Sequence, residues 1–177
     1  SVDGHKWLQT PYDCAYAIVK DRAAHARAMR IPASYLPSSD DDARNPSDFV
    51  PELSRRARGF ATWAMIRRLG RRGIADMVTR HCAQVRLFAQ KLGEAPGVAV
   101  MNDVVLNQVA VHFGSDAQTK AVIARVQADG TCFVGGAEWR GKQVMRISVI
   151  NENTTEAEGD RAVAAMLAAW DAVRGAN

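Results

Sequence analysis

Apolar residues recur every three or four positions in the middle of the chain, which is the spacing of amphipathic helices. The pattern predicts one helix over residues 52–69 and a second from 73 or 74 to 92, with Gly70 near the end of the first. The second has a continuous apolar stripe, which includes Ile74, Met77, Val78, Cys82, Val85, Phe88 and Leu92. His81 falls on this stripe, so we expect it to be packed or hydrogen-bonded rather than a ligand.

Beyond residue 93 the pattern alternates between short apolar runs and helical spacing. Strands are predicted at 98–101, 104–113, 132–134 and 143–150, and helices at 116–128 and after Thr154 or Thr155. The turn Arg140-Gly141-Lys142 predicts a hairpin. Gly135-Gly136 is interpreted as a bend, because the wider glycine pattern of a phosphate loop is missing. This order predicts an α+β fold, with helices on one face of a small, mostly antiparallel sheet.

The first fifty residues are less regular. Residues 15–19 read as a short buried strand, and residues 22–29 as one or two helical turns. Residues 30–51 contain four prolines and an aspartate run, which predicts a long irregular loop. Loops of this length inside compact proteins are usually functional or mobile.

Composition fits a soluble globular protein. The chain has 177 residues, of which 47% are hydrophobic and 24% charged, enough for one domain or for one small domain and part of another. No apolar run approaches the ~20 residues of a membrane span, so no membrane partner is expected. Cys14, Cys82 and Cys132 fit neither a disulfide framework nor a metal site, which predicts reduced thiols in a cytoplasmic protein without a bound metal.

The net charge of +4 is concentrated in one stretch. Residues 51–93 contain ten Lys and Arg against two Asp and Glu. These arginines alternate with apolar residues at helical intervals, which favours an amphipathic helix whose charges face solvent, a neighbouring subunit or an acidic loop. A nucleic-acid partner is therefore not expected.

Lys6 is the main candidate for chemistry. It lies between His5 and Trp7, and an amine in a partly apolar setting can lose its charge, as Schiff-base chemistry requires. The ordinary interpretation of such a residue is a surface lysine, and spacing alone does not decide between the two.

Three segments resemble one family. Asp3-Gly-His-Lys-Trp-Leu with Pro11-Tyr-Asp-Cys is similar to the cofactor-lysine segment of the group II pyridoxal-phosphate decarboxylases, the family of the glutamate and aromatic amino-acid decarboxylases. Residues 51–63 resemble the arginine-rich helix start that follows the family's mobile loop. Residues 144–151, followed by Thr154-Thr155-Glu156, resemble its last strand and the entry to its final helix.

The resemblance implies a fold and a cofactor. The chain would be the C-terminal part of a type I pyridoxal-phosphate enzyme, with residues 1–50 as the end of the large cofactor-binding domain. Residues 51–177 would be connecting helices and the small domain. Lys6 would carry pyridoxal 5'-phosphate as a Schiff base, and His5 would contact its phosphate. Because the chain begins at Ser1, we expect a fragment of a longer chain that is inactive and holds the cofactor weakly by itself.

The resemblance also implies further site residues. Arg146, flanked by apolar neighbours on a strand, is either solvated or pairs with the substrate carboxylate. Tyr35 and Phe49 lie in the segment that corresponds to the family's catalytic loop, whose tyrosine helps to protonate the substrate carbon. Phe49 lies nearer the family position and has no hydroxyl, and related enzymes without that tyrosine tend toward oxidative deamination to an aldehyde.

The expected function is decarboxylation of a small-molecule L-amino acid by a homodimer. The alternatives are another type I activity, such as an aldehyde synthase or aminotransferase, or a non-catalytic dimerisation or interaction domain.

Overall fold

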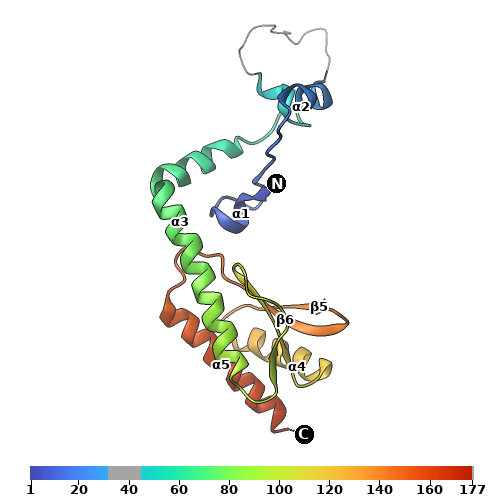
Figure 1. Ribbon diagram of the computed structural model, residues 1–177, viewed down its shortest axis with the longest axis vertical. Helices are drawn as coiled ribbons and strands as arrows, with labels where there is room; N and C mark the ends of the chain where they lie inside the picture. The colour runs from blue at the N-terminus through green and yellow to red at the C-terminus, as the bar shows by residue number, and fades with distance from the viewer. Residues whose placement is uncertain (32–44, 177) are drawn as a thin grey trace. The chain divides into compact units, whose positions relative to one another are not determined.

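A computed structural model of the chain describes residues 1–31 and 45–176. The chain divides into two compact units, Ser1–Arg67 and Arg68–Asn177, which are described one at a time (Figure 1). The predicted assignment of residues 1–50 and 51–177 to different domains of a longer protein stays a prediction.

The first unit contains short elements. A two-residue strand β1 (Val2–Asp3) pairs antiparallel with β2 (Ala15–Tyr16), and helix α1 (Gly4–Trp7) follows β1 directly. Helix α2 (Arg22–Met29) confirms the predicted helical turns, and the Asp21 side chain caps it by accepting a hydrogen bond from the Ala24 backbone N–H. A single 3-10 turn, η1 (Pro46–Phe49), follows the segment that lies outside the described residues.

The predicted buried strand over residues 15–19 is wrong beyond Tyr16. The described residues pair β2 with β1 alone, so residues 17–19 have no sheet to join, and the Ile18 side chain is 81% exposed. Cys14, just before β2, is the buried residue of this stretch.

Helix α3 (Arg58–Gly93) contains both predicted helices of the middle region. It begins at Arg58 rather than at residue 52, after Pro51, a residue without a backbone N–H for a helical ladder. The helix is interrupted at Gly70, whose φ of 63° lies in the left-handed region that glycine adopts without a steric penalty. The predicted break at this glycine is therefore confirmed.

The second unit contains a four-stranded antiparallel sheet. Strands β3 (Val98–Val100), β4 (Gln108–Phe113), β6 (Lys142–Ser148) and β5 (Gly135–Trp139) lie in the order β3-β4-β6-β5. Strands β5 and β6 form the predicted hairpin, with positive φ at both Arg140 and Gly141, as a type I′ turn requires.

One prediction about this sheet is wrong. Gly135 and Gly136 do not bend the chain away from the sheet but begin β5, where they pair with Arg146 and Met145. Residues 132–134 precede the strand instead of forming one. The antiparallel ladder with β6 supplies the hydrogen bonds that keep these two glycines extended.

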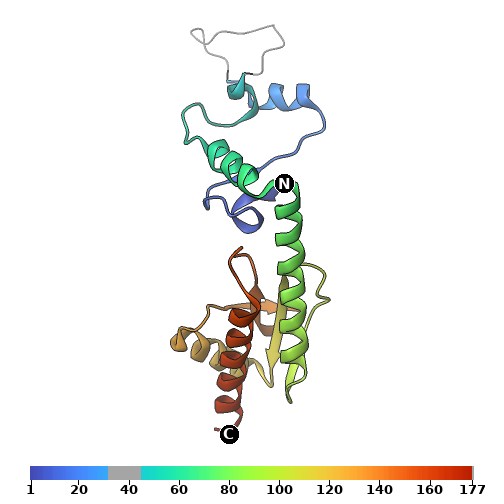
Figure 2. The ribbon, with the colours of Figure 1, turned by 90° about the vertical axis from the view of Figure 1, so that its left-hand side faces the viewer.

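Three helical segments supply the other layer of this unit. The part of α3 after Gly70, α4 (Asp116–Asp129) and α5 (Glu156–Arg174) pack on the sheet through one shared core, and Figures 1 and 2 show α3 and α5 side by side. Ser115 caps α4, and Thr155 with Glu158 forms a capping box at α5. The predicted α+β architecture is confirmed. The core includes Val85, Phe88, Leu92, Val109, Val111, Phe113, Val122, Val126, Met145, Ile147, Met166 and Trp170.

Helix α3 also holds the loop between β6 and α5. The His81 ring, which is fully buried, lies with Nε2 3.1 Å from the Asn151 carbonyl oxygen, and Gln84 Nε2 donates to the Thr154 carbonyl at 2.7 Å. Burial lowers the pKa of His81, which favours a neutral ring that donates from Nε2. The expectation of a hydrogen-bonded histidine is therefore confirmed.

None of the helices within the described residues has the length and apolar character needed to cross a membrane. Cys14, Cys82 and Cys132 are all free thiols.

Candidate functional site

Lys6 lies on α1, one turn after β1. Its Nζ donates a hydrogen bond to Asp3 Oδ2 at 2.6 Å, and its side chain is 55% exposed. The hydrogen bond from Lys6 holds the pKa of the Asp3 carboxyl below its usual range. In the described structure Lys6 is thus half-exposed and paired with a carboxylate.

The backbone fixes the segment that carries Lys6. Val2 pairs with Tyr16 and Asp3 with Ala15, and the Gly4 N–H donates to the Cys14 carbonyl at 2.9 Å. Between residues 3 and 15 the chain therefore reverses direction and pairs antiparallel with itself.

His5 lies against the turn that follows α1. Its ring stacks on Tyr12, with ring centroids 4.5 Å apart and an interplanar angle of 28°. The Nδ1 atom of His5 is buried and has no hydrogen-bond partner among the described residues. A buried polar atom without a partner is costly, so this atom suits a site where a polar group binds beside Lys6.

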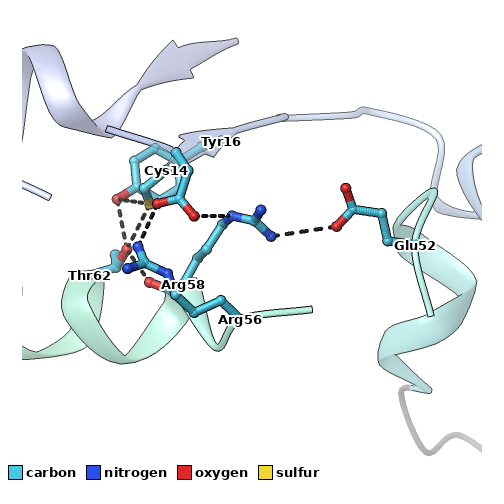
Figure 3. A network of polar contacts seen from close by, with 7 residues as sticks. Cys14, Tyr16, Glu52, Arg56, Arg58 and Thr62 are labelled. Atoms are coloured by element: carbon cyan, nitrogen blue, oxygen red, sulfur yellow. Dashed lines mark hydrogen bonds and ion pairs between the residues drawn. The ribbon is translucent and has the colours of Figure 1, made fainter. Parts of the chain in front are cut away.

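Three further polar side chains meet next to this segment (Figure 3). The Tyr16 and Thr62 hydroxyl oxygens lie 2.8 Å apart, and the Cys14 Sγ lies 3.5 Å from the first and 3.6 Å from the second. Burial raises the pKa of Cys14, but hydrogen bonds with Tyr16 and Thr62 outweigh it and leave the pKa below its usual value. Burial raises the pKa of Tyr16, which keeps its phenol protonated at neutral pH.

Ion pairs anchor the start of α3 to the same turn. Asp13 accepts hydrogen bonds from Arg56 and from Arg58 Nε, the latter at 3.2 Å, and Arg58 also lies 3.6 Å from Glu52. Sequence reasoning expected these arginines to face solvent, a subunit or an acidic loop. In the described structure, Arg56 and Arg58 pair with a carboxylate of the lysine-bearing segment.

Of the two loop candidates, Phe49 lies within the described residues and Tyr35 does not. Phe49 ends η1, where its ring contacts His25 edge-on at 5.5 Å and lies 5.5 Å below the Arg22 guanidinium carbon. It lines a cavity of about 830 Å³ within the first unit, together with Cys14, Tyr16, Met29, Thr62 and Trp63. Tyr35 lies outside the described residues.

Arg146 belongs to the second unit, in the middle of β6. It pairs across the sheet with Ala110 on one side and Gly135 on the other, while its neighbours Met145 and Ile147 are buried in the core. These small partners leave a shallow cavity of about 190 Å³ around the exposed arginine, which is also lined by Asn102, Gln108, Ala137, Glu138, Trp139 and Val144. Within the described part of the chain, Arg146 has no ion-pair partner, so its guanidinium is available to an anion.

His5 and Lys6 therefore lie together in the first unit, and Arg146 lies in the second. Sequence reasoning missed Gly4, Tyr16 and Thr62; the glycine directly before His5-Lys6 was the one local signal. No group of His, Cys, Asp and Glu within the described residues is arranged to hold a metal ion.

The chain is similar to known proteins in both sequence and fold. The family profile described as "Pyridoxal-dependent decarboxylase conserved domain" matches residues 1–113. The rat aromatic-L-amino-acid decarboxylase is 24% identical over 96% of this chain and 35% of its own length. The Arabidopsis thaliana tyrosine decarboxylase 2 is 26% identical over 84% of this chain and 29% of its own length.

The fold is also shared with solved structures. The rice (Oryza sativa) TDC, crystallised with PLP and tryptamine, has a TM-score of 0.85 and 17% identity, over 96% of this chain and 38% of that chain. This likeness confirms the expected C-terminal part of the type I fold. The chain spans about a third of the length of the relatives it matches. With the profile covering residues 1–113, the chain belongs to the pyridoxal-dependent decarboxylase family.

Proposed function

We propose that this chain supplies the cofactor lysine and the small domain of a pyridoxal-phosphate-dependent L-amino-acid decarboxylase. The observation that carries the proposal is the pair His5-Lys6, which lies inside the matched family region and includes a buried His5 Nδ1 atom without a hydrogen-bond partner among the described residues. The complete protein is proposed to be a cytoplasmic homodimer that acts on a small-molecule amino acid.

Each residue has a distinct part in this proposal. Pyridoxal phosphate, when bound, would take up the electron pair of the bond that breaks to release carbon dioxide. Lys6 would hold the cofactor through a covalent bond to its Nζ. The same nitrogen would gain or lose a proton during the reaction. Asp3 accepts a hydrogen bond from this amine at 2.6 Å before the cofactor arrives. His5 Nδ1 would provide a hydrogen bond to a polar oxygen of the bound group.

The direct test is carbon dioxide release by the complete protein with pyridoxal phosphate. A panel of aromatic and acidic L-amino acids would be assayed, and at least one should yield carbon dioxide and the corresponding amine. Relatives that match this chain are named as aromatic-L-amino-acid and tyrosine decarboxylases, so the aromatic members of the panel are expected to react. Carbon dioxide release from no member of the panel would contradict the proposal.

A second candidate activity follows from Phe49. This residue has no hydroxyl to donate a proton, and its ring packs against His25 and Arg22. The alternative is oxidative deamination, as expected for an aldehyde synthase: molecular oxygen would be reduced to hydrogen peroxide while carbon dioxide, ammonia and an aldehyde are released. The same assays distinguish the two activities, because amine and aldehyde are separated and quantified for each substrate.

Arg146 is proposed to bind the substrate carboxylate. A planar guanidinium can donate two parallel hydrogen bonds to a carboxylate, and charge-assisted bonds of this kind contribute about 1.5–3 kcal/mol. Arg146→Gln should therefore raise KM for the amino acid by roughly 10- to 100-fold in steady-state assays, with cofactor binding unchanged. Arg125→Gln, which removes an exposed arginine of α4 outside the cavity around Arg146, is the matched control. Equal KM values for Arg146→Gln and the unmodified protein would show that this arginine is merely solvated.

A further inference from the structure

Gly4, two residues before Lys6, lies where no side chain fits. A Cβ atom built on this glycine would lie 2.5 Å from Thr10 Oγ1, 2.7 Å from the Tyr16 hydroxyl and 2.9 Å from Tyr16 Cε2. Carbon atoms do not approach other heavy atoms this closely, so the Thr10 and Tyr16 side chains together occupy the space that a larger residue at position 4 would need. The start of α1 therefore rests directly on Tyr16.

Tyr16 is in turn held by a distant part of the unit. Its hydroxyl lies 2.8 Å from Thr62 Oγ1, and Thr62 stands in the first turns of α3, 46 residues further along the chain. Figure 3 shows the Tyr16 and Thr62 hydroxyls and the Cys14 sulfur converging on one point. This contact links α3 to the segment that carries Lys6.

Helix α1 needs such support because it is too short to be stable alone. It has four residues, and the Leu8 N–H to Gly4 carbonyl bond of 2.7 Å closes its single turn. The exposed ion pair between Lys6 and Asp3 adds little rigidity. The direction of the Lys6 amine therefore depends on what fixes Gly4, namely the Cys14 carbonyl and the Tyr16 ring.

We propose that Tyr16 is a positioning residue for Lys6, with its ring packed against Gly4 and its hydroxyl fixed by Thr62. This inference rests on the proposed function, because it assumes that Lys6 is the residue that holds the cofactor. It assigns Tyr16 and Thr62 a role in setting the orientation of the amine, although neither is expected to touch the substrate.

The test compares variants that remove one oxygen with a variant that keeps it. Tyr16→Phe retains the ring and loses the hydroxyl, and Thr62→Val replaces the hydroxyl by a methyl group of similar size. Thr62→Ser keeps the hydroxyl and is the matched control. Each is made in the full-length protein, and folding is followed by circular dichroism and thermal unfolding.

Two readouts besides activity report the orientation of Lys6. The dissociation constant of pyridoxal phosphate and the pH midpoint of its visible absorbance band are measured for each variant. Tyr16→Phe and Thr62→Val should each weaken cofactor binding by about 3- to 10-fold, as expected for one lost buried hydrogen bond, and should move the pH midpoint. Thr62→Ser should match the unmodified protein. The double variant should lose less than the sum of the two single variants, because both remove the bond between Tyr16 and Thr62.

A compensation experiment tests the packing half of the proposal. Gly4→Ala should weaken cofactor binding by more than about 10-fold, since the added methyl group forces Tyr16 away. Adding Tyr16→Ala to Gly4→Ala should recover part of that loss, because it removes the two close contacts with Tyr16 and leaves only the one with Thr10 Oγ1. If Gly4→Ala leaves cofactor binding unchanged, the packing of Tyr16 against Gly4 does not determine the orientation of Lys6.

The outcomes separate this inference from the proposed function. If borohydride fixes the cofactor on Lys6 but Tyr16→Phe leaves both readouts unchanged, the positioning role is wrong and the function stands. If borohydride fixes no cofactor on Lys6 in the unmodified protein, the proposed function fails first. Should Thr62→Val not fold, Tyr16→Phe alone decides, because it removes a single buried oxygen and keeps the ring.

Discussion

Lys6→Ala is expected to abolish the covalent attachment of pyridoxal phosphate to the complete protein. Borohydride treatment followed by peptide mapping should place the cofactor on Lys6 in the unmodified protein and on no residue in the variant. Decarboxylation should fall by more than about 10²-fold, because the group that holds the cofactor and moves protons at its own nitrogen is missing. The visible absorbance of the bound cofactor should disappear with it.

Two controls separate chemistry from charge in this experiment. Lys20→Ala removes an exposed lysine from the same unit and should leave the visible absorbance unchanged. Lys6→Arg keeps a positive charge that can pair with Asp3, but a guanidinium does not form the covalent bond. If Lys6→Ala retained both the absorbance and the borohydride-fixed cofactor, the assignment of Lys6 would be wrong.

Trp170→Ala is expected to be among the most destabilising substitutions in the second unit. The Trp170 side chain is 4% exposed, its ring lies 5.8 Å from that of Phe113, and its Nε1 donates to the Pro96 carbonyl at 2.9 Å. Truncation leaves a large cavity and removes the hydrogen bond to the Pro96 carbonyl, so the free energy of unfolding should fall by about 3–5 kcal/mol. Urea-induced unfolding would measure it.

Matched variants show which part of the indole matters. Trp170→Phe keeps an aromatic ring and loses the hydrogen bond, so its cost should be smaller than that of alanine. Trp139→Ala removes a half-exposed tryptophan at the end of β5 and should cost less than about 1 kcal/mol. A loss for Trp170→Ala as small as that for Trp139→Ala would show that the core does not depend on this residue.

The second unit could be predicted largely from the sequence because its signals are local. The helix starts of α4 and α5 are specified by capping side chains within a few residues, and the hairpin by the Arg140-Gly141 turn. The glycines of β5 were misread because nothing near them in sequence indicates a strand. Their extended conformation depends on pairing with Arg146 and Met145, and strand formation is set by such neighbours more than by intrinsic preference.

The first unit was predicted less well for a related reason. Residues 15–19 have an apolar pattern that predicts burial, but burial depends on what covers them, and in the described structure Ile18 is mostly exposed. Lys6 was found through its resemblance to a family segment, whereas its ion pair with Asp3 was not foreseen. The contact between Tyr16 and Thr62 joins residues 46 positions apart, and no local pattern reports it.

The edges of the four-stranded sheet affect how the protein behaves in concentrated solution. Among the residues that the structure describes, β3 and β5 are the outermost strands, so one side of each backbone has no strand partner there. Strand β3 offers three residues, and β5 begins with two glycines and carries Glu138 close to its end. Short, glycine-containing and charged borders are poor templates for a strand from another molecule. The folded sheet should therefore resist the edge-to-edge growth that leads to aggregation.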